Sequence, residues 1–343
     1  MNIRKVAEIA GVSVATISRV LNHPEQVLPE TRERVLAVMR EQDYTPNWFA
    51  RGLNLGKTNT ISLLVPSIES GLHQSIMSGI ETVARNKGYA VFFCDTHGDA
   101  QIEYDYLKMA ETRRIDGVIL ICSRLGEQQL LPLREKRLLP CVHIGKNRIV
   151  GCETLCYIDF DEGAYRLMRH LLSLGHQRFH LLLDPLQESE AAQIRSGMRR
   201  ALADQGLPTD SFSESFSENS VRGGYLAAQK IMQKGSLPHA LVTSGHEQAF
   251  GVIKAAQDEG LDIPARLALA SLTDSPVCPI VTPPLTGLEL PAAKLGMAAA
   301  RMLFDRIEDE ELDLNVPQEM VLQPKLKIRR SCGNRKYIYE LFD

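Results

Sequence analysis

The first 22 residues, MNIRKVAEIAGVSVATISRVLN (1–22), contain the pattern that decides how the chain begins. Val6, Ile9 and Ala10 recur at three- and four-residue spacing, which predicts a short helix with one apolar face. Gly11 follows at the point where a tight turn needs a residue that tolerates positive φ. Ser13 is then suited to cap the N-terminus of a second helix.

The predicted second helix has two different faces. Its inward face is apolar and consists of Ile17, Val20 and Leu21. Its outward face is short, polar or basic and consists of Val14, Ala15, Ser18 and Arg19. This arrangement predicts a helix-turn-helix whose second helix enters the major groove of DNA and contacts base edges. The alternative is an ordinary helical hairpin, but the turn length and the outward face favour the DNA-binding motif.

Length and composition set the broad class. The chain has 343 residues, of which 44% are hydrophobic, so we expect a globular protein of two to three units. It has no apolar run of 18 residues and no signal-type segment near the polar start, which favours a cytoplasmic protein without a membrane partner.

Charge and cysteine content narrow the possible partners. The net charge of the chain is −3, but residues 1–22 carry three basic residues, Arg4, Lys5 and Arg19, and a single acidic one, Glu8. A cationic head can still bind phosphates, because screening confines electrostatic effects to about 8 Å. The seven cysteines are scattered and mostly lie in apolar runs, which indicates reduced core thiols. Cys152 and Cys156 lack the spacing and the histidine companions of a zinc site, so we expect neither metal nor cofactor.

The head continues to about residue 45. Residues 31–42 form a strongly helical segment that ends before Pro46. The following segment, WFARGLNLGK (48–57), is too short and glycine-rich to be a stable helix alone, so we expect it to fold on binding DNA. Gly56-Lys57-Thr58 is not a phosphate loop, because Gly52 is one residue too close and no strand precedes it.

From Thr60 onward, short β-branched strands alternate with amphipathic helices. The predicted strands are 61–65, 91–94, 117–122, 141–144, 155–158, 179–183, 240–242 and 267–269, with a late strand near 320–322. The predicted helices are 76–86, 102–112, 164–174, 192–205, 223–233, 249–259 and 292–307. This order predicts an α/β fold with two open, doubly wound parallel sheets in tandem, each with ligand-binding potential at the carboxyl ends of its strands.

These motifs together resemble the LacI/GalR family of bacterial transcriptional repressors. In the head the resemblance rests on residues 6–22, on TRERV (31–35), on Tyr44-x-Pro-Asn47 and on Leu53. In the core it rests on Asp116-Gly117, Gly163-Ala164, Gly175-His176 and Pro283-Pro284-Leu285-Thr286. Periplasmic sugar-binding proteins share the core fold, so the core landmarks are less specific than the head.

The resemblance implies a domain organisation. It places a helix-turn-helix domain at 1–45, a hinge at 46–58, a two-lobed periplasmic-binding-protein-like core at 59–331 and a tail at 332–343. The first lobe would comprise about 59–157 and 289–318, and the second about 158–288 and 319–331. The tail is too short for a coiled coil, so we expect a homodimer rather than a tetramer.

The resemblance also implies roles for residues of the head on a palindromic double-stranded operator. Val14, Ala15 and Arg19 would contact base edges, where arginine suits guanine and the apolar pair suits thymine methyl groups. The phosphate contacts would come from Ser13, Thr16, Ser18, Asn22 and Asn47. For Ser13 and Thr16 plain helix capping is the alternative, and both roles can hold together. Leu53 would insert into the minor groove, although a simple linker–core contact is the alternative for this residue.

The implied effector pocket departs from the pattern of sugar-binding members at four polar positions. Gly145, Ile194, Gly245-His246 and Thr273-Asp274 replace the usual anchors. The residues expected to face the cleft are Ser67, Ile68, Leu72, His73, Ser123, Lys146, Arg195, His246 and Asp274. Their basic and imidazole groups favour an anion, with a sugar phosphate or a sugar acid ahead of a neutral sugar. Alternatively, Lys146 is a solvated loop residue, and His73 and His246 are surface or lobe-interface histidines with ordinary structural roles.

The sequence therefore predicts an effector-controlled, DNA-binding repressor, with carbohydrate-metabolism genes as the expected targets. An exported solute-binding protein is opposed by the intact head and the lack of a signal segment. An enzyme is opposed by the lack of a nucleophile elbow, a dinucleotide loop or paired metal ligands, so no catalytic residues are assigned.

Overall fold

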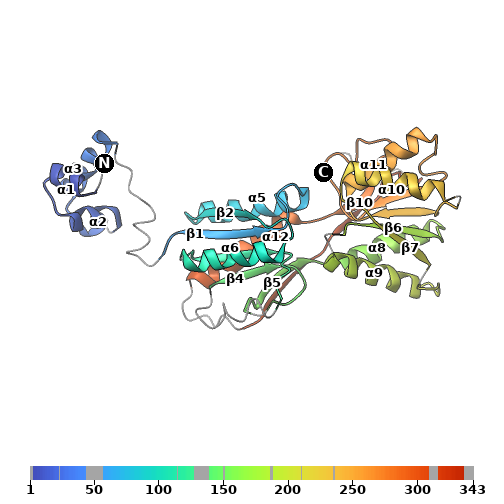
Figure 1. Ribbon diagram of the computed structural model, residues 1–343, viewed down its shortest axis with the longest axis horizontal. Helices are drawn as coiled ribbons and strands as arrows, with labels where there is room; N and C mark the ends of the chain where they lie inside the picture. Colours follow the sequence, from blue (N-terminus) through green and yellow to red (C-terminus); the bar gives the residue numbers. More distant parts are fainter. Residues whose placement is uncertain are drawn as a thin grey trace. The chain divides into compact units, whose positions relative to one another are not determined.

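The computed structural model describes residues 3–22, 24–43, 57–113, 115–126, 139–149, 151–185, 188–209, 211–234, 236–308 and 316–335. The chain forms two compact units, residues 1–59 and 60–343 (Figure 1). Most of the predicted hinge, including Asn47 and Leu53, lies outside the described residues. Among the helices in the described ranges, none is long and apolar enough to cross a membrane.

The described part of the first unit is a head that contains three α-helices. It consists of α1 (Ile3–Ala10), α2 (Val14–Asn22), a short 3-10 turn η1 (Pro24–Gln26) and α3 (Pro29–Glu41). Its buried core is apolar and comprises Val6, Ala7, Ala10, Ile17, Val20, Val35, Val38 and Met39. The expectation that Ile9 faces this core is wrong, since its side chain is 44% exposed. The 3.6-residue period turns Ala7 inward in place of Ile9.

The turn between α1 and α2 has the predicted geometry. Gly11 has a φ of +64°, and its N–H donates to the Glu8 carbonyl at 3.2 Å. Ser13 precedes α2, and its Oγ accepts a hydrogen bond from the Thr16 N–H at 3.1 Å. These contacts satisfy backbone groups that a helix end otherwise leaves without partners.

Replacing Ser13 by alanine should therefore destabilise the start of α2 by about 1 kcal/mol. Hydrogen exchange of the full chain measures this, because the amides of residues 14–19 should exchange faster. Ser13→Thr keeps the capping oxygen and should restore most of the protection. Equal exchange rates in wild type and Ser13→Ala would show that this cap does not stabilise α2.

The first lobe of the second unit contains a parallel six-stranded sheet in the order β11-β5-β4-β3-β1-β2. Its strands are β1 (Thr60–Val65), β2 (Ala90–Asp95), β3 (Gly117–Ile121), β4 (Cys141–Ile144), β5 (Thr154–Ile158) and β11 (Gln318–Leu322). Its helices within the described residues are α5 (Gly71–Asn86), α6 (Ala100–Thr112) and α12 (Ala292–Glu308), of which α5 and α12 pack against each other.

The second lobe contains a six-stranded sheet in the order β12-β10-β9-β8-β6-β7, in which only β12 is antiparallel to its neighbour. Its strands are β6 (Phe179–Leu183), β7 (Phe212–Phe216), β8 (Ala240–Thr243), β9 (Ala268–Ser271), β10 (Thr286–Glu289) and β12 (Lys325–Lys327). Its helices are α8 (Phe160–Ser173), α9 (Glu188–Ala203), α10 (Val221–Gln233) and α11 (His246–Asp258).

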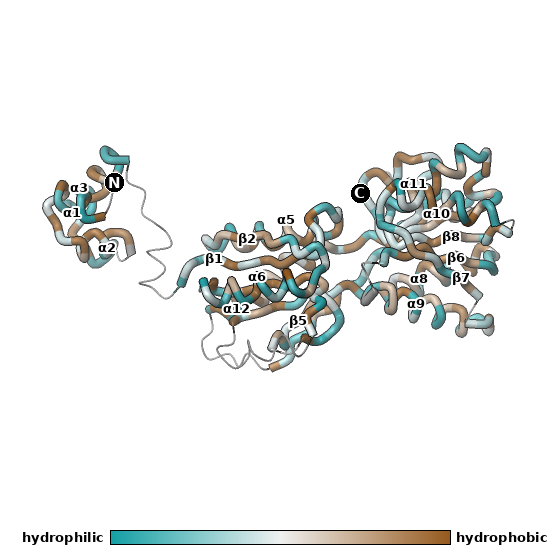
Figure 2. The backbone as a smooth tube through the Cα atoms, in the orientation of Figure 1, coloured by the Kyte–Doolittle hydropathy of each residue, from teal (hydrophilic) through white to brown (hydrophobic). Residues whose placement is uncertain are grey.

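Both sheets are buried between helices, as parallel sheets are in doubly wound folds. Every residue of β1, β3, β6 and β8 is buried, and Figure 2 shows β1, β6 and β8 as largely apolar segments. The aromatic rings of Tyr89 and of Phe304, a residue of α12, meet edge to face with centroids 4.8 Å apart. Each sheet is therefore held by the apolar faces of its own helices.

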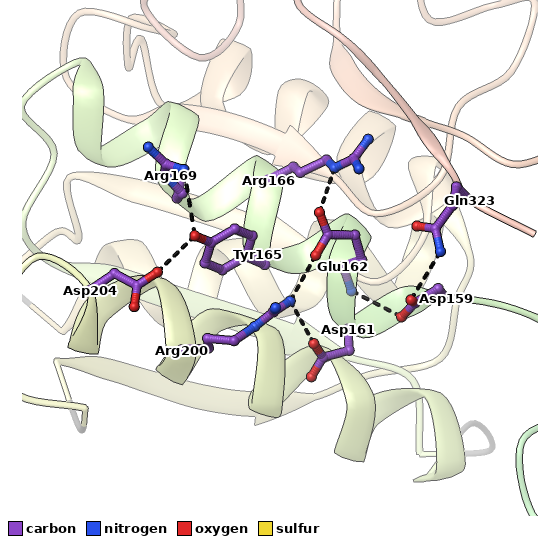
Figure 3. Close-up of polar contacts among 9 residues, drawn as sticks. All are labelled: Asp159, Asp161, Glu162, Tyr165, Arg166, Arg169, Arg200, Asp204 and Gln323. Atoms are coloured by element: carbon purple, nitrogen blue, oxygen red, sulfur yellow. Dashed lines mark hydrogen bonds and ion pairs between the residues drawn. The ribbon is translucent and has the colours of Figure 1, made fainter.

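The chain passes between the lobes three times: between β5 and α8, between β10 and α12, and between β11 and β12. The boundary expected at residue 318 is too early, because β11 extends to Leu322 and pairs with β5 of the first sheet. Figure 3 shows how the first and third passages are joined: Gln323 Nε2 donates to Asp159 Oδ2 at 3.1 Å.

The same polar network ties the first passage to the helices of the second lobe (Figure 3). Asp159 caps α8 by accepting the Glu162 N–H at 3.1 Å. Arg200 of α9 donates to Asp161 at 2.7 Å and to Glu162 at 2.9 Å. The passage between the lobes is thus fixed to the α8–α9 pair.

Candidate functional site

The outward face of α2 presents the side chains that the sequence predicted. Val14, Ala15 and Arg19 are exposed, whereas Thr16 and Ser18 are half-buried. The hydroxyl groups of Ser13 and Thr16 lie 2.9 Å apart, so capping occupies them in this structure. The side chain of Asn22 lies outside the description, as do Asn47 and Leu53. This short, exposed face carries one cation and two small apolar groups, which suits contact with base edges.

The second unit contains a cavity of about 740 Å³ lined by both lobes. Its first-lobe wall comes from the segment after β1, the start of α5 and the residues after β3. Its second-lobe wall comes from the residues that follow β6, β7, β8 and β9 and from the start of α9. These are the carboxyl ends of the parallel strands, where ligands bind in open α/β sheets.

Five of the nine predicted effector residues line this cavity: Ser67, Leu72, His73, His246 and Asp274. The other four, Ile68, Ser123, Lys146 and Arg195, do not. Ile68 is exposed, and Lys146 Nζ lies 5.7 Å from the centroid of the Tyr157 ring. The Ser123 N–H donates to His143 Nε2 at 3.3 Å.

The expectation that Arg195 faces the cleft is wrong. Its Nε lies 2.9 Å from Glu214 Oε2 of β7, and its guanidinium lies over the ring of Phe216. The preceding residue, Ile194, lines the cavity instead. One residue along a helix turns a side chain by about 100°, which is enough to move it off the cavity wall.

The two cavity histidines are held by hydrogen bonds. His73 Nδ1 lies 2.9 Å from the Ser67 carbonyl oxygen, and His246 Nδ1 lies 2.8 Å from Thr273 Oγ1. Burial lowers the pKa of His73, and the Ser67 carbonyl and the nearby charges of Glu190, Asp95 and Asp184 offset this only in part. Burial also lowers the pKa of His246. Both imidazoles are therefore neutral at pH 7 and supply no positive charge.

The described cations that do line the cavity are Arg124, Lys327 and Arg329. Arg329 is bound in a bidentate ion pair with Asp274, with N–O distances of 2.8 and 2.7 Å, and it also donates to the Leu285 carbonyl. Lys327 Nζ lies 3.6 Å from Glu289 Oε2. Asp274 is thus already paired with a cation within the cavity lining.

Sequence reasoning missed the carboxylates that line the same cavity. Asp184 directly follows β6 and is buried, and Glu190 lies in the first turn of α9. A usable signal was present, because the first polar residue after a buried parallel strand lies at the sheet edge where ligands bind. Across the described ranges, no group of three or more His, Cys, Asp or Glu side chains could hold a metal ion.

Comparisons with known proteins agree with this anatomy. The family model of bacterial regulatory proteins of the lacI family matches residues 2–47, and that of a periplasmic binding protein-like domain matches residues 168–332. The HTH-type transcriptional repressor PurR of Yersinia pestis bv. Antiqua is 30% identical over 333 residues, which cover 97% of each chain. The chain belongs to the LacI family of bacterial regulatory proteins.

Solved structures of LacI-family regulators have the same fold. The lac repressor dimer bound to operator and the anti-inducer ONPF aligns with a TM-score of 0.84 at 23% identity, covering 97% of this chain and 99% of that one. A LacI family regulator from Enterococcus faecium with bound ribose aligns with a TM-score of 0.71 at 25% identity, covering 79% of this chain and 98% of that one. The regulator CelR in complex with cellobiose aligns with a TM-score of 0.69 at 25% identity, covering 96% and 99%.

The structure explains one of the substituted anchors in this family member. A Cβ atom at Gly145 would lie 2.5 Å from Cε1 of His143, so the His143 ring fills the space that a side chain at 145 would need. A side chain at 145 would therefore require the His143 ring to move.

Proposed function

We propose that this LacI-family regulator is a homodimeric repressor that binds a palindromic operator and is controlled by a small molecule in the interlobe cavity. The observation that supports this best is the presence, in one chain, of an exposed helix-turn-helix face and a 740 Å³ cavity between two lobes. A volume of this size is typical of small-molecule sites. The role we infer is regulatory rather than catalytic.

On the operator, Val14, Ala15 and Arg19 would contact base edges and so determine sequence preference. Phosphates would be bound by Ser13, Thr16, Ser18, Asn22 and Asn47, which fix the register of the head without specifying sequence. Leu53 would insert into the minor groove at the centre of the operator. A dimer would place two such heads on two half-sites related by a two-fold axis.

The ligand we propose is a polyhydroxylated molecule of the size of a sugar, in line with the ribose and cellobiose held by the two regulators described above. An anionic sugar derivative, which the sequence favoured, is not supported. That expectation rested on Lys146, Arg195 and charged histidines, yet neither cation lines the cavity and both histidines are neutral. Regulation of carbohydrate-metabolism genes remains the proposed role.

Footprinting of the full-length protein on DNA fragments from its own genome tests this function. We expect protection of a few palindromic sites, with half-sites about one helical turn apart, and little protection elsewhere. Uniform, salt-sensitive binding to all fragments would contradict a sequence-specific repressor.

A further inference from the structure

One end of the interlobe cavity consists of side chains from both lobes. The second lobe contributes Asp184, after β6, and Glu190, at the start of α9. The first lobe contributes His73 of α5 and Cys122, which follows β3. The Cys122 thiol donates to Glu190 Oε1 at 3.1 Å, so the lobes meet here directly. Burial and the Glu190 charge raise the pKa of Cys122, which keeps this thiol protonated.

His73 presents a hydrogen-bond acceptor at this end of the cavity. Its Nδ1 must donate to the Ser67 carbonyl oxygen, which has no proton to give. In the neutral ring, Nε2 therefore carries the lone pair. The side chain is only 5% exposed, and Nε2 makes no hydrogen bond within the described part of the chain. A ligand group at this nitrogen must therefore be a donor.

The charge of the lining favours a positively charged donor. Among the residues that the structure describes, seven carboxylates and three cations line the cavity: Glu69, Asp184, Glu190, Glu218, Glu247, Asp274 and Glu289 against Arg124, Lys327 and Arg329. Two of those cations are already close to carboxylates, Arg329 to Asp274 and Lys327 to Glu289. Hydroxyl groups of a neutral sugar would supply donors, but they would add no positive charge to a lining in which the described carboxylates outnumber the described cations.

We propose that the cavity binds a hexose-sized polyol that carries a protonated primary amine, with its ammonium group beside Glu190, Asp184 and His73. An ammonium group supplies three donors and one positive charge, which matches two carboxylates and one imidazole nitrogen. This inference rests on the proposed function and names the class of ligand for the same cavity.

Calorimetric titration of the full-length protein with matched probes tests the inference. The probes are glucosamine, galactosamine and mannosamine, each compared with its N-acetyl derivative and its parent hexose, together with glucose 6-phosphate and gluconate. We expect at least one amino hexose to bind about tenfold more tightly than both of its uncharged counterparts, because charge-assisted hydrogen bonds strengthen the contact.

Two variants assign the effect to the site. Glu190→Gln keeps an oxygen for the Cys122 thiol but removes the charge, so it should reduce the affinity for the amino hexose about tenfold and spare that for the parent hexose. Glu81→Gln removes an equal charge from the exposed side of α5, outside the cavity, and should change neither affinity.

Three outcomes would overturn the inference: tighter binding of a parent hexose, tighter binding of an anionic probe, or no binding of any amino hexose at concentrations up to about 10 mM, which corresponds to a binding free energy weaker than about 3 kcal/mol. Operator footprints are measured without ligand. A protein that gives the expected footprints but prefers the parent hexose therefore keeps the proposed function and loses only this inference.

Discussion

Replacing Arg19 by alanine is expected to weaken binding to the specific operator by about 1–3 kcal/mol, that is, roughly five- to 150-fold. Arg19 is exposed on the outward face of α2, where a guanidinium reaches two acceptors of one guanine. The preference for that guanine in each half-site should weaken in the variant, while binding to unrelated DNA should change little. Titrations on the operator and on single-base variants of it measure both quantities.

Arg34→Ala provides the matched control. It removes the same charge from an exposed position of α3 rather than of α2. We expect it to leave the base preference unchanged. If Arg19→Ala reduced affinity equally for every DNA sequence, Arg19 would be a phosphate contact and not a reader of bases.

The second large effect is expected in mildly acidic solution, through His143 of β4. Burial lowers the pKa of this imidazole to about 4, with a smaller opposing effect from the Asn147 backbone. Its side chain is 2% exposed, and Nε2 accepts the Ser123 N–H. Between an unfolded-chain pKa of about 6.5 and this folded value, the unfolded chain binds more proton than the folded chain. Stability therefore falls as the pH decreases through that window.

Protonation of His143 should lower the free energy of unfolding by about 3 kcal/mol between pH 7 and pH 4. Urea titrations at a series of pH values measure it, as the difference between the wild type and His143→Asn, because other titrating groups contribute equally to both. His97→Asn is the control, since His97 is exposed and has a φ of +51°, which asparagine tolerates. Equal pH slopes in the wild type and His143→Asn would contradict the assignment.

Patterns of local spacing predicted most of the architecture. The helix-turn-helix followed from a turn glycine, a capping serine and apolar spacing, all of which act within a few residues. The long buried strands were recognisable because parallel strands are apolar on both faces. Helices began up to five residues earlier than predicted, at α5 for example, because capping by Ser70 lets a polar first turn join the helix.

The remaining features depend on contacts between distant residues. The strand β7 was missed because FSESF (212–216) is an edge strand with polar positions, and β10 (TGLE, 286–289) and β12 (KLK, 325–327) are short and lack a continuous apolar run. The direction of Arg195 depends on the exact rotation of α9, which periodicity fixes only loosely. Glu190 and Asp184 line the cavity because of the way in which the two lobes pack, and no local sequence pattern predicts that packing.

The third passage between the lobes also constrains how the protein is made. Translation delivers residues 60–158 first, yet the first sheet receives its covering helix α12 and its edge strand β11 only when residues 292–322 have been synthesised. The whole sequence of β6 to β10 must leave the ribosome before then. The apolar face of α5 that packs on α12 therefore stays uncovered through much of synthesis, which is a period of aggregation risk. A nascent chain stalled before residue 292 should depend on chaperones far more than one stalled after residue 322.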